Sequence, residues 1–347
     1  MRSLTPQPAY ADVEPLLLSR HRSAIAAYMH RMRAPAGALS GKMLSYHMGW
    51  SDEAGRPLQV KTGKLIRPAL CLWAAAACGS EPDAALPAAA AVEWFHNFTL
   101  VHDDIQDGDR RRHGRETVWS IWGVAQGINT GDAMHALAFL SLASSGADPA
   151  RALAAIRAVG EAGLQVIEGQ CLDMALEGRT EAALRDYLRM VNAKTGALLG
   201  GALEAGALLG GAEPQRARLF RLAGRLLGTA FQIQDDALGI FGDPSVTGKS
   251  ASGDADRQKM TYPVIAGMSA ASPAQRRRLR DIFRIPSEET GTNLRTVLEE
   301  IGCDRITRAT AQRYAQKAVA AAARAGIPRT AIDEFEEVAY YVATRNR

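Results

Sequence analysis

Two aspartate clusters lie within apolar stretches of this chain, and this feature most restricts how the chain can fold. The first cluster is Asp103, Asp104 and Asp107, and the second cluster is Asp235 and Asp236. The surrounding residues have the apolar periodicity of long helices, so the aspartates would lie on or beside inward faces. Ionised carboxylates placed together resist burial unless a cation or hydrogen-bond donors compensate them. The sequence therefore predicts helices whose packing requires a partner for these aspartates.

The aspartates favour a hard divalent cation. Oxygen ligands without a nearby cysteine or histidine quartet suit Mg²⁺ better than Zn²⁺. On a helix, Asp103 and Asp107 would point together, while Asp104 would lie about 100° away. Because Mg²⁺ is usually completed by water and substrate phosphates, two clusters facing one cavity would predict a metal-held diphosphate substrate.

The remaining sequence predicts an all-α protein. Alternating Val, Ile and Thr runs are scarce and aromatic residues make up only 6% of the chain, so the core must be built from helix against helix. No composition break divides the chain, which predicts a single domain over residues 1–347. Prolines, capping residues and glycines predict a helix beginning near residue 63 and further helices over 88–108, 117–145, 149–178, 181–211, 214–241 and 330–347.

Two segments stand apart from these helices. The polar, proline-containing segment 1–20 is expected to be poorly ordered. Residues 242–260 lose apolar periodicity over a length at which loops are usually functional, so we expect an active-site loop there.

Composition excludes several classes of function. The net charge of +4 comes from basic residues spread along the chain, which does not favour nucleic-acid binding. The four cysteines form no CxxC pair, which predicts a reducing, cytoplasmic location. The most apolar run, 197–212, is interrupted by Glu204 and by glycines, so no membrane span is expected.

The order of motifs resembles the trans-isoprenyl diphosphate synthases, the polyprenyl synthetase family that includes farnesyl and geranylgeranyl diphosphate synthases. The resemblance runs from about Met48 to the C-terminus. Residues 96–107 are similar to the family's first aspartate-rich motif, and residues 231–239 to its second. The other matching motifs are Gly63-Lys64-x-x-Arg67-Pro68, Gly131-Asp132, Gly169-Gln170-x-x-Asp173, Lys194-Thr195 and the segment 254–263.

This resemblance implies the isoprenoid synthase fold, a single large helical bundle around a central cavity that both clusters face. It implies a Mg²⁺-dependent condensation of isopentenyl diphosphate with an allylic diphosphate, which yields a short all-trans prenyl diphosphate. Three Mg²⁺ ions would be bound directly by Asp103, Asp107 and Asp235, with Asp104 and Asp236 in support. The family commonly forms homodimers, so a homodimer is expected by analogy.

The resemblance also assigns the substrate contacts. Lys194 and Lys259, with Arg112, would hold the allylic diphosphate and stabilise its departure. Isopentenyl diphosphate would lie against Lys64, Arg67 and His96. The remaining expected substrate-binding residues are His113, Thr195 and Gln232.

Three positions depart from the family pattern. The usual Arg-Arg-Gly is Arg112-His113-Gly114 here, and a histidine cannot form the bidentate fork of an arginine, so affinity for isopentenyl diphosphate is expected to fall unless Arg111 or Arg115 substitutes. Gly239 stands where many relatives carry a third aspartate, and Thr62 replaces a glycine.

Product length should depend on the residues four and five positions before Asp103, which are Thr99 and Phe98. One aromatic residue there predicts a C15 or C20 product, although Phe98 would be ordinary core packing in most helical proteins.

Alternative interpretations remain open at this stage. A class I terpene synthase on the same fold would ionise a prenyl diphosphate without condensation, and His113 favours it. An inactive subunit that regulates a partner synthase is a third possibility. A solvated helix face would explain a single aspartate cluster, and a frayed basic tail would explain Arg345 and Arg347.

Overall fold

The computed structural model describes residues 13–58, 63–179, 182–242, 259–284 and 290–346. These residues fold into two compact units. Unit 1 contains residues 1–15, 164–200 and 222–347, and unit 2 contains residues 16–163 and 201–221. Helices α8 (Pro149–Leu176), α10 (Ala197–Leu209) and α11 (Pro214–Phe241) contribute residues to both units.

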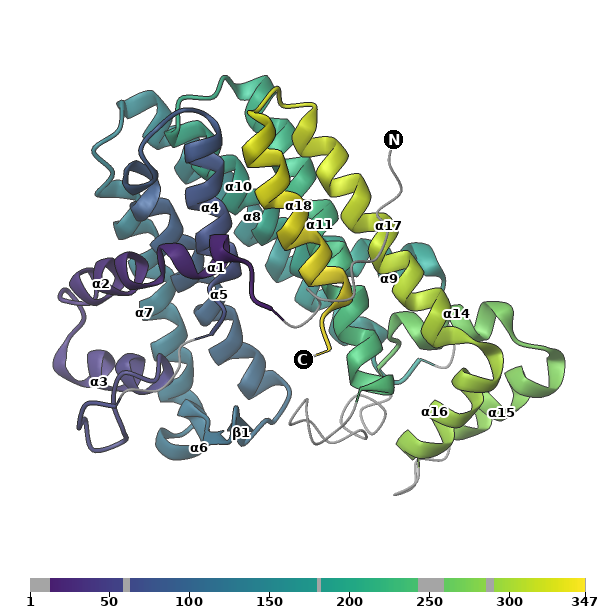
Figure 1. Cartoon of the computed structure of the whole chain (residues 1–347). Helices are drawn as coiled ribbons and strands as arrows, with labels where there is room; N and C mark the ends of the chain where they lie inside the picture. The colour runs from purple at the N-terminus through teal and green to yellow at the C-terminus, as the bar shows by residue number, and fades with distance from the viewer. Residues whose placement is uncertain (1–12, 59–62, 180–181, 243–258, 285–289, 347) are drawn as a thin grey trace. The chain divides into compact units, whose positions relative to one another are not determined.

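Unit 2 is built around α5, which carries the first cluster. Its own elements are α1 (Leu16–Arg20), α2 (Arg22–Met32), α3 (Ala38–His47), α4 (Ile66–Ala77), the 3₁₀ turn η2 (Pro82–Ala85), α5 (Leu86–Gln106), β1 (Arg111–Arg112), β2 (Arg115–Glu116), α6 (Val118–Trp122) and α7 (Val124–Ala143). Helix α5 packs against α4 and along α7 (Figure 1). Residues 87–92 in its first half are apolar and buried on all sides, and Trp94 and Phe95 continue the buried surface, which explains why this part of α5 lies inside the unit.

Small residues let the helices of unit 2 approach backbone to backbone. A Cβ at Gly206 of α10 would overlap the carbonyl oxygen of Cys71 in α4. One helical turn later, a Cβ at Gly210 would lie 2.7 Å from Ala75 O. Glycine is therefore required at both positions by the close contact between α10 and α4.

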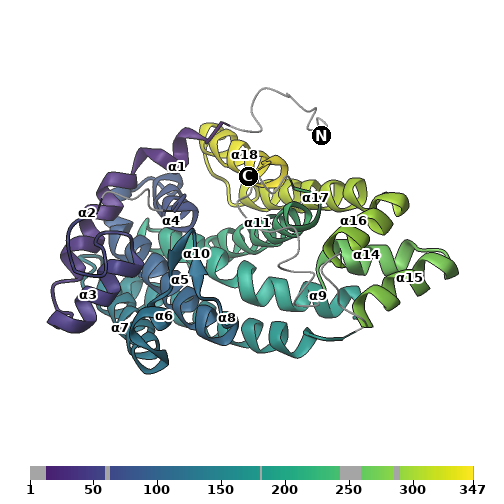
Figure 2. The same cartoon turned by 90° about the horizontal axis from the view of Figure 1, so that it is seen from below.

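Unit 1 carries the second cluster on the C-terminal half of α11. Its other elements are α9 (Leu184–Val191), the π-helical turn η3 (Asn192–Gly196), α14 (Tyr262–Ala270), α15 (Pro273–Arg284), α16 (Thr290–Ile301), α17 (Cys303–Ala323) and α18 (Arg329–Thr344). Helices α17 and α18 lie side by side, and α14, α15 and α16 pack together (Figure 2).

The predicted all-α class is confirmed, and α11 has the predicted bounds 214–241. The predicted helix 117–145 is instead two helices, because Gly123 has a φ of 87° between α6 and α7. The helix expected from residue 63 begins only at Ile66, since Leu65 adopts the left-handed conformation.

The expected poorly ordered segment 1–20 is wrong for residues 16–20, which form α1 with Leu17 and Leu18 buried. Residues 1–12, Thr62, Asp254, Arg347 and most of the expected loop 242–260 lie outside the described residues. A single domain over 1–347 stays a prediction. None of the described helices has the length and hydropathy needed to cross a membrane.

Candidate active site

The first cluster lies at the C-terminal end of α5. Asp103 and Asp104 are in its last turn and Asp107 is its C-cap. Asp103 and Asp107 are half-buried, whereas Asp104 is only 2% exposed, as their helical spacing predicts. Because the C-terminal end of a helix carries partial negative charge, carboxylates there are favoured only with a compensating cation.

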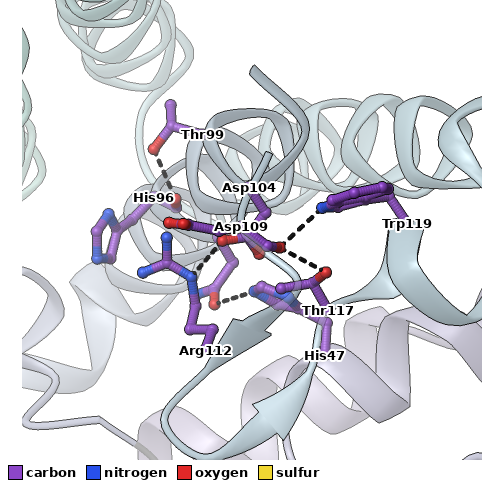
Figure 3. Close-up of polar contacts among 9 residues, drawn as sticks. His47, His96, Thr99, Asp104, Asp109, Arg112, Thr117 and Trp119 are labelled. Atoms are coloured by element: carbon purple, nitrogen blue, oxygen red, sulfur yellow. Dashed lines mark hydrogen bonds and ion pairs between the residues drawn. The ribbon is translucent and has the colours of Figure 1, made fainter. Parts of the chain in front are cut away.

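Arg112 supplies that cation for Asp104. Its Nε donates a hydrogen bond to Asp104 Oδ1 over 2.7 Å (Figure 3). Burial raises the pKa of Asp104 to about 6, and the nearby Arg112 charge opposes this shift. The carboxylate of Asp104 is therefore engaged by the protein, which fits a supporting role and not that of a direct metal ligand.

A tight hairpin places Arg112. Strands β1 and β2 pair antiparallel, with Arg112 opposite Arg115. The turn residues His113 and Gly114 have φ values of 49° and 78°, as a type I′ turn requires. Histidine is one of the few residues with a side chain that enter this left-handed region with some frequency, so His113 suits the turn.

Arg115 is already committed to structural contacts. Its two terminal nitrogens donate to Tyr46 O over 3.0 Å and to Ser51 O over 3.1 Å. Its guanidinium also lies over the Tyr46 ring at 4.2 Å. Arg115 therefore ties the hairpin to the end of α3. It could replace the missing second arginine only by giving up these bonds, and Arg111 is exposed and does not line the cavity described next.

A cavity of about 480 Å³ opens beside this hairpin within unit 2. Beside apolar residues, its lining holds two arginines, three imidazoles, three acidic residues and one amide, namely Arg112, Arg115, His47, His96, His113, Glu93, Asp104, Glu116 and Asn97. Gly63 and Leu65, on either side of Lys64, also contribute. Arg67 is close enough to Glu93 and His96 to affect the pKa of each. This composition suits an anionic ligand.

Asn97 fixes the orientation of His47, a cavity residue that the sequence analysis missed. Asn97 Nδ2 donates to Glu93 O over 2.8 Å and to Glu93 Oε1 over 3.1 Å. Asn97 Oδ1 must then accept from His47 Nε2, at 3.1 Å. His47 lies outside every recognised motif, so no spacing signal could have identified it.

Two of the three cavity histidines, His47 and His96, are held neutral. Burial, followed by the Arg112 charge, lowers the pKa of His47 to about 4. Burial and the charges of Arg67 and Arg112 lower the pKa of His96 well below its ordinary value. At pH 7 these imidazoles therefore offer hydrogen bonds without positive charge.

The second cluster, in unit 1, is also divided into a buried and a more exposed carboxylate. Asp236 is 6% exposed and accepts bonds from Tyr187 Oη (2.6 Å), Tyr262 N (2.8 Å) and Gln232 Nε2 (3.0 Å). The side chain of Asp235 is 34% exposed and forms an ion pair with Arg345. Three protein donors satisfy Asp236, so Asp235 is the member of this cluster suited to metal binding.

The predicted lysines gather in unit 1. Lys194 Nζ donates to Asp173 Oδ2 over 2.6 Å, and Lys259 Nζ lies 3.8 Å from the same oxygen and 3.7 Å from Glu177 Oε1. Lys194 belongs to the π-helical turn η3, a feature that often marks functional sites. The next residue, Thr195, donates to Gln232 Oε1 over 2.9 Å.

Gly169 explains why two separate motifs meet here. A Cβ at this position of α8 would overlap the backbone nitrogen of Lys194. Gly169 is therefore needed so that the backbone of Lys194 can lie against α8.

Phe98 belongs to an aromatic cluster in unit 2. Its ring centroid lies 5.1 Å from Phe95, 4.9 Å from His102 and 5.2 Å from His135. His135 in turn lies 5.2 Å from Phe139 on the same helix, α7. Neighbouring Thr99 is half-buried and bonds to His96 O over 2.7 Å. Sequence spacing around Asp103 could not reveal that α7 supplies two of these rings.

The aspartates fit Mg²⁺ only with help from other ligands. In the described part of the chain, no three His, Cys, Asp or Glu side chains are grouped so as to hold a metal ion alone. Asp103 and Asp107 in unit 2, and Asp235 in unit 1, offer oxygen donors of the kind that Mg²⁺ prefers, and water or diphosphate oxygens would complete the shell of an ion bound at either cluster. Arg345 already places a positive charge against Asp235, so this position favours a cation.

The lowered pKa of His47 predicts sensitivity to acid. The unfolded chain binds a proton on this imidazole near pH 6.5, whereas the folded chain does so only near pH 4. The unfolded state binds more protons between these values, so the free energy of unfolding should fall as the pH is lowered from 6.5 to 4. His47→Gln has no imidazole to protonate. Its free energy of unfolding, measured by urea unfolding at several pH values, should therefore fall by up to about 3 kcal/mol less over this pH range than that of the unmodified protein. An equal pH dependence in His47→Gln and the unmodified protein would contradict the assignment.

Comparison with known proteins places these features in a family. Residues 49–301 match the family model described as polyprenyl synthetase. The chain is 42% identical over 309 residues to a (2E,6E)-farnesyl diphosphate synthase of Mycobacterium tuberculosis, covering 87% of this chain and 85% of the relative. It is 39% identical over 318 residues to a geranylgeranyl diphosphate synthase of the same organism, covering 90% and 89%.

A solved structure shows the same fold. The crystal structure of a polyprenyl synthetase from Streptomyces coelicolor matches with a TM-score of 0.87 and 36% identity, over 94% of this chain and 98% of that one. The fold is accordingly the helical isoprenoid synthase fold. With the family model matching most of its length, this chain belongs to the polyprenyl synthetase family.

Proposed function

We propose that this protein is a Mg²⁺-dependent prenyltransferase that condenses isopentenyl diphosphate with an allylic diphosphate to give a short all-trans prenyl diphosphate. The observation that carries the proposal is the cavity beside the first cluster, lined by Arg112, His96 and His113. A second diphosphate requires such an anion-binding cavity, and an enzyme that only ionises one prenyl diphosphate does not. The two relatives named farnesyl and geranylgeranyl diphosphate synthase support the same reaction class.

The proposed role of each residue follows from the charge of its side chain. Lys194 and Lys259 would hold the allylic diphosphate as its bond to C1 breaks, because negative charge develops on that leaving group. The isopentenyl double bond then attacks C1, and the proton lost from isopentenyl passes to the released diphosphate. Asp103, Asp107 and Asp235 would hold the metal, and bound Mg²⁺ would add positive charge beside the leaving group.

Isopentenyl diphosphate would occupy the unit 2 cavity. Arg112 supplies a fixed positive charge there, oriented by its bond to Asp104. Lys64 and Arg67 are not among the residues that line the cavity, but they lie on either side of the lining residue Leu65 and would add positive charge near it. The neutral imidazoles of His47 and His96 can donate hydrogen bonds. His113, at the turn, keeps the hairpin geometry without the second arginine of the family motif.

The decisive experiment incubates the purified protein with Mg²⁺, labelled isopentenyl diphosphate and dimethylallyl, geranyl or farnesyl diphosphate in turn. A longer labelled prenyl alcohol that appears only after phosphatase treatment would support the synthase and give its product length. Hydrocarbon or alcohol formed from the allylic substrate alone would favour the terpene synthase. No turnover with any substrate would favour the regulatory subunit.

Asp103→Ala should lower incorporation of label by about 100-fold or more, because it removes a ligand for the cation that stabilises the leaving group. Asp83→Ala, an exposed carboxylate on η2, serves as the control and should keep full activity. Circular dichroism would confirm that both variants fold. Near-normal rates in Asp103→Ala would exclude the metal assignment.

Phe98 is proposed to limit product length to C15 or C20, since its buried ring would lie where a growing chain must pass. Phe98→Leu should shift the products toward longer chains in thin-layer or chromatographic analysis. Phe220→Leu removes the same volume from another buried aromatic site of unit 2, against Trp73, and should not change the products. An unchanged profile in Phe98→Leu would make Phe98 a core residue only.

A homodimer is also proposed. Within unit 1, helix α8 exposes Leu164 (72%), Ile167 (44%) and Met174 (47%), with Cys171 exposed on the same stripe. Spacings of three, seven and ten residues place these side chains on one face of the helix. Exposed large apolar side chains gathered on one face are typical of an interface, and the resemblance to the family makes a second copy the expected partner.

Leu164→Arg should convert the dimer to a monomer at micromolar concentration in size-exclusion chromatography with light scattering, because a charge would be buried in the interface. The control is Leu16→Arg, which changes a leucine that is 65% exposed on α1. A dimer that persists in Leu164→Arg would exclude this face.

A cytoplasmic location stays a prediction. All four cysteines carry free thiols, which fits the reducing compartment that their spacing indicates.

A further inference from the structure

Arg345, two residues before the end of the chain, is a fixed part of unit 1. It directly follows α18 and is 4% exposed. Its backbone nitrogen donates to Tyr341 O over 3.0 Å, and its carbonyl oxygen accepts from Gln234 Nε2 over 2.8 Å. The sequence-based expectation of a frayed tail is therefore wrong for Arg345.

The Arg345 side chain is held by one face of α11. Its guanidinium lies over the Phe231 ring at 4.0 Å and forms an ion pair with Asp235. Phe231, Gln234 and Asp235 are spaced i, i+3 and i+4, so they lie next to one another on the helix surface. Arg345 thus covers the face of α11 that presents Asp235.

The charge of Arg345 has a specific role. Asp236 is already satisfied by Tyr187, Tyr262 and Gln232, so Arg345 compensates Asp235 and not the whole cluster. The contacts around this ion pair also leave two buried polar atoms without a hydrogen bond in the described part of the chain. Arg345 Nε and Gln234 Oε1 are both buried and have no hydrogen-bond partner among the described residues. Contacts selected only for stability usually satisfy such buried atoms, so this arrangement suits a contact that is exchanged for another.

We infer that Arg345 is a positioning residue that occupies the place of a cation at Asp235, and that a divalent cation binding to Asp235 must displace its guanidinium. The inference rests on the proposed role of Asp235 as a metal ligand. A metal ion on this carboxylate would lie within a few ångströms of the Arg345 guanidinium, and the two positive charges would repel each other, so the ion pair and the metal compete. Metal binding would then require the ion pair and the Phe231 contact to break, and this cost would weaken the affinity for the metal. When no metal is bound, Arg345 would compensate the charge of Asp235.

The test measures binding of Mn²⁺, as a probe for Mg²⁺, by electron paramagnetic resonance of the free ion, with and without inorganic diphosphate. Arg345→Gln should bind Mn²⁺ about fivefold more tightly or better, a typical size for coupling between two binding events. Arg345→Lys retains a charge that can compete and should stay close to the unmodified protein. The control Arg329→Gln removes an exposed arginine of α18 that pairs with Asp333, and it should not change the affinity for Mn²⁺.

Equal or weaker Mn²⁺ binding by Arg345→Gln would overturn the inference. A protein ended at Thr344 gives the same test if Arg345→Gln does not fold, and it too should bind Mn²⁺ more tightly. Asp235→Asn separates the two proposals. If it still binds Mn²⁺ normally, Asp235 is not a ligand and the proposed metal site fails, whereas loss of binding in Asp235→Asn with no effect of Arg345→Gln rejects the competition alone.

Discussion

Compensation of adjacent carboxylates is the interaction on which both units depend. Neighbouring residues of a helix point about 100° apart, so each Asp-Asp pair is divided into one inward and one more exposed side chain. Asp104 and Asp236 are the inward members, and Arg112 or a set of tyrosine and glutamine donors satisfies them. Asp103 and Asp235 remain nearer the surface. One aspartate of each pair is therefore held by the protein's own hydrogen-bond donors, and we propose that the other binds a metal ion.

The unit 2 cavity shows how a change in a motif can be accommodated. His113 loses the charge of the family arginine but fits a turn that requires positive φ. Around it, Arg112 keeps a full charge, while burial holds His47 and His96 neutral. The cavity thus combines two arginines with several hydrogen-bond donors, which suits the anionic ligand proposed for it. Such a site distinguishes ligands by geometry as well as by charge.

Glycines and the π-helical turn determine how closely the elements of unit 1 approach. Gly169 admits the backbone of Lys194, and η3 sets the direction of Lys194 and Thr195 relative to α8 and α11. The sequence contained each of these motifs, yet their spacing of more than twenty residues carried no information about their contact. Packing alone brings Lys194 to Asp173 and Thr195 to Gln232.

The sequence by itself determined the all-α class, the bounds of helices such as α11, the two aspartate clusters and the motifs of the family. These follow from local periodicity, capping residues and residue chemistry, which neighbouring positions in the chain specify. Only the tertiary structure decided that His47 lines the cavity, that Arg115 is committed to Tyr46 and Ser51, that α7 adds rings to Phe98, and that Arg345 pairs with Asp235. Each of these joins residues that are distant in the chain, and such contacts depend on how helices pack, which no local pattern encodes.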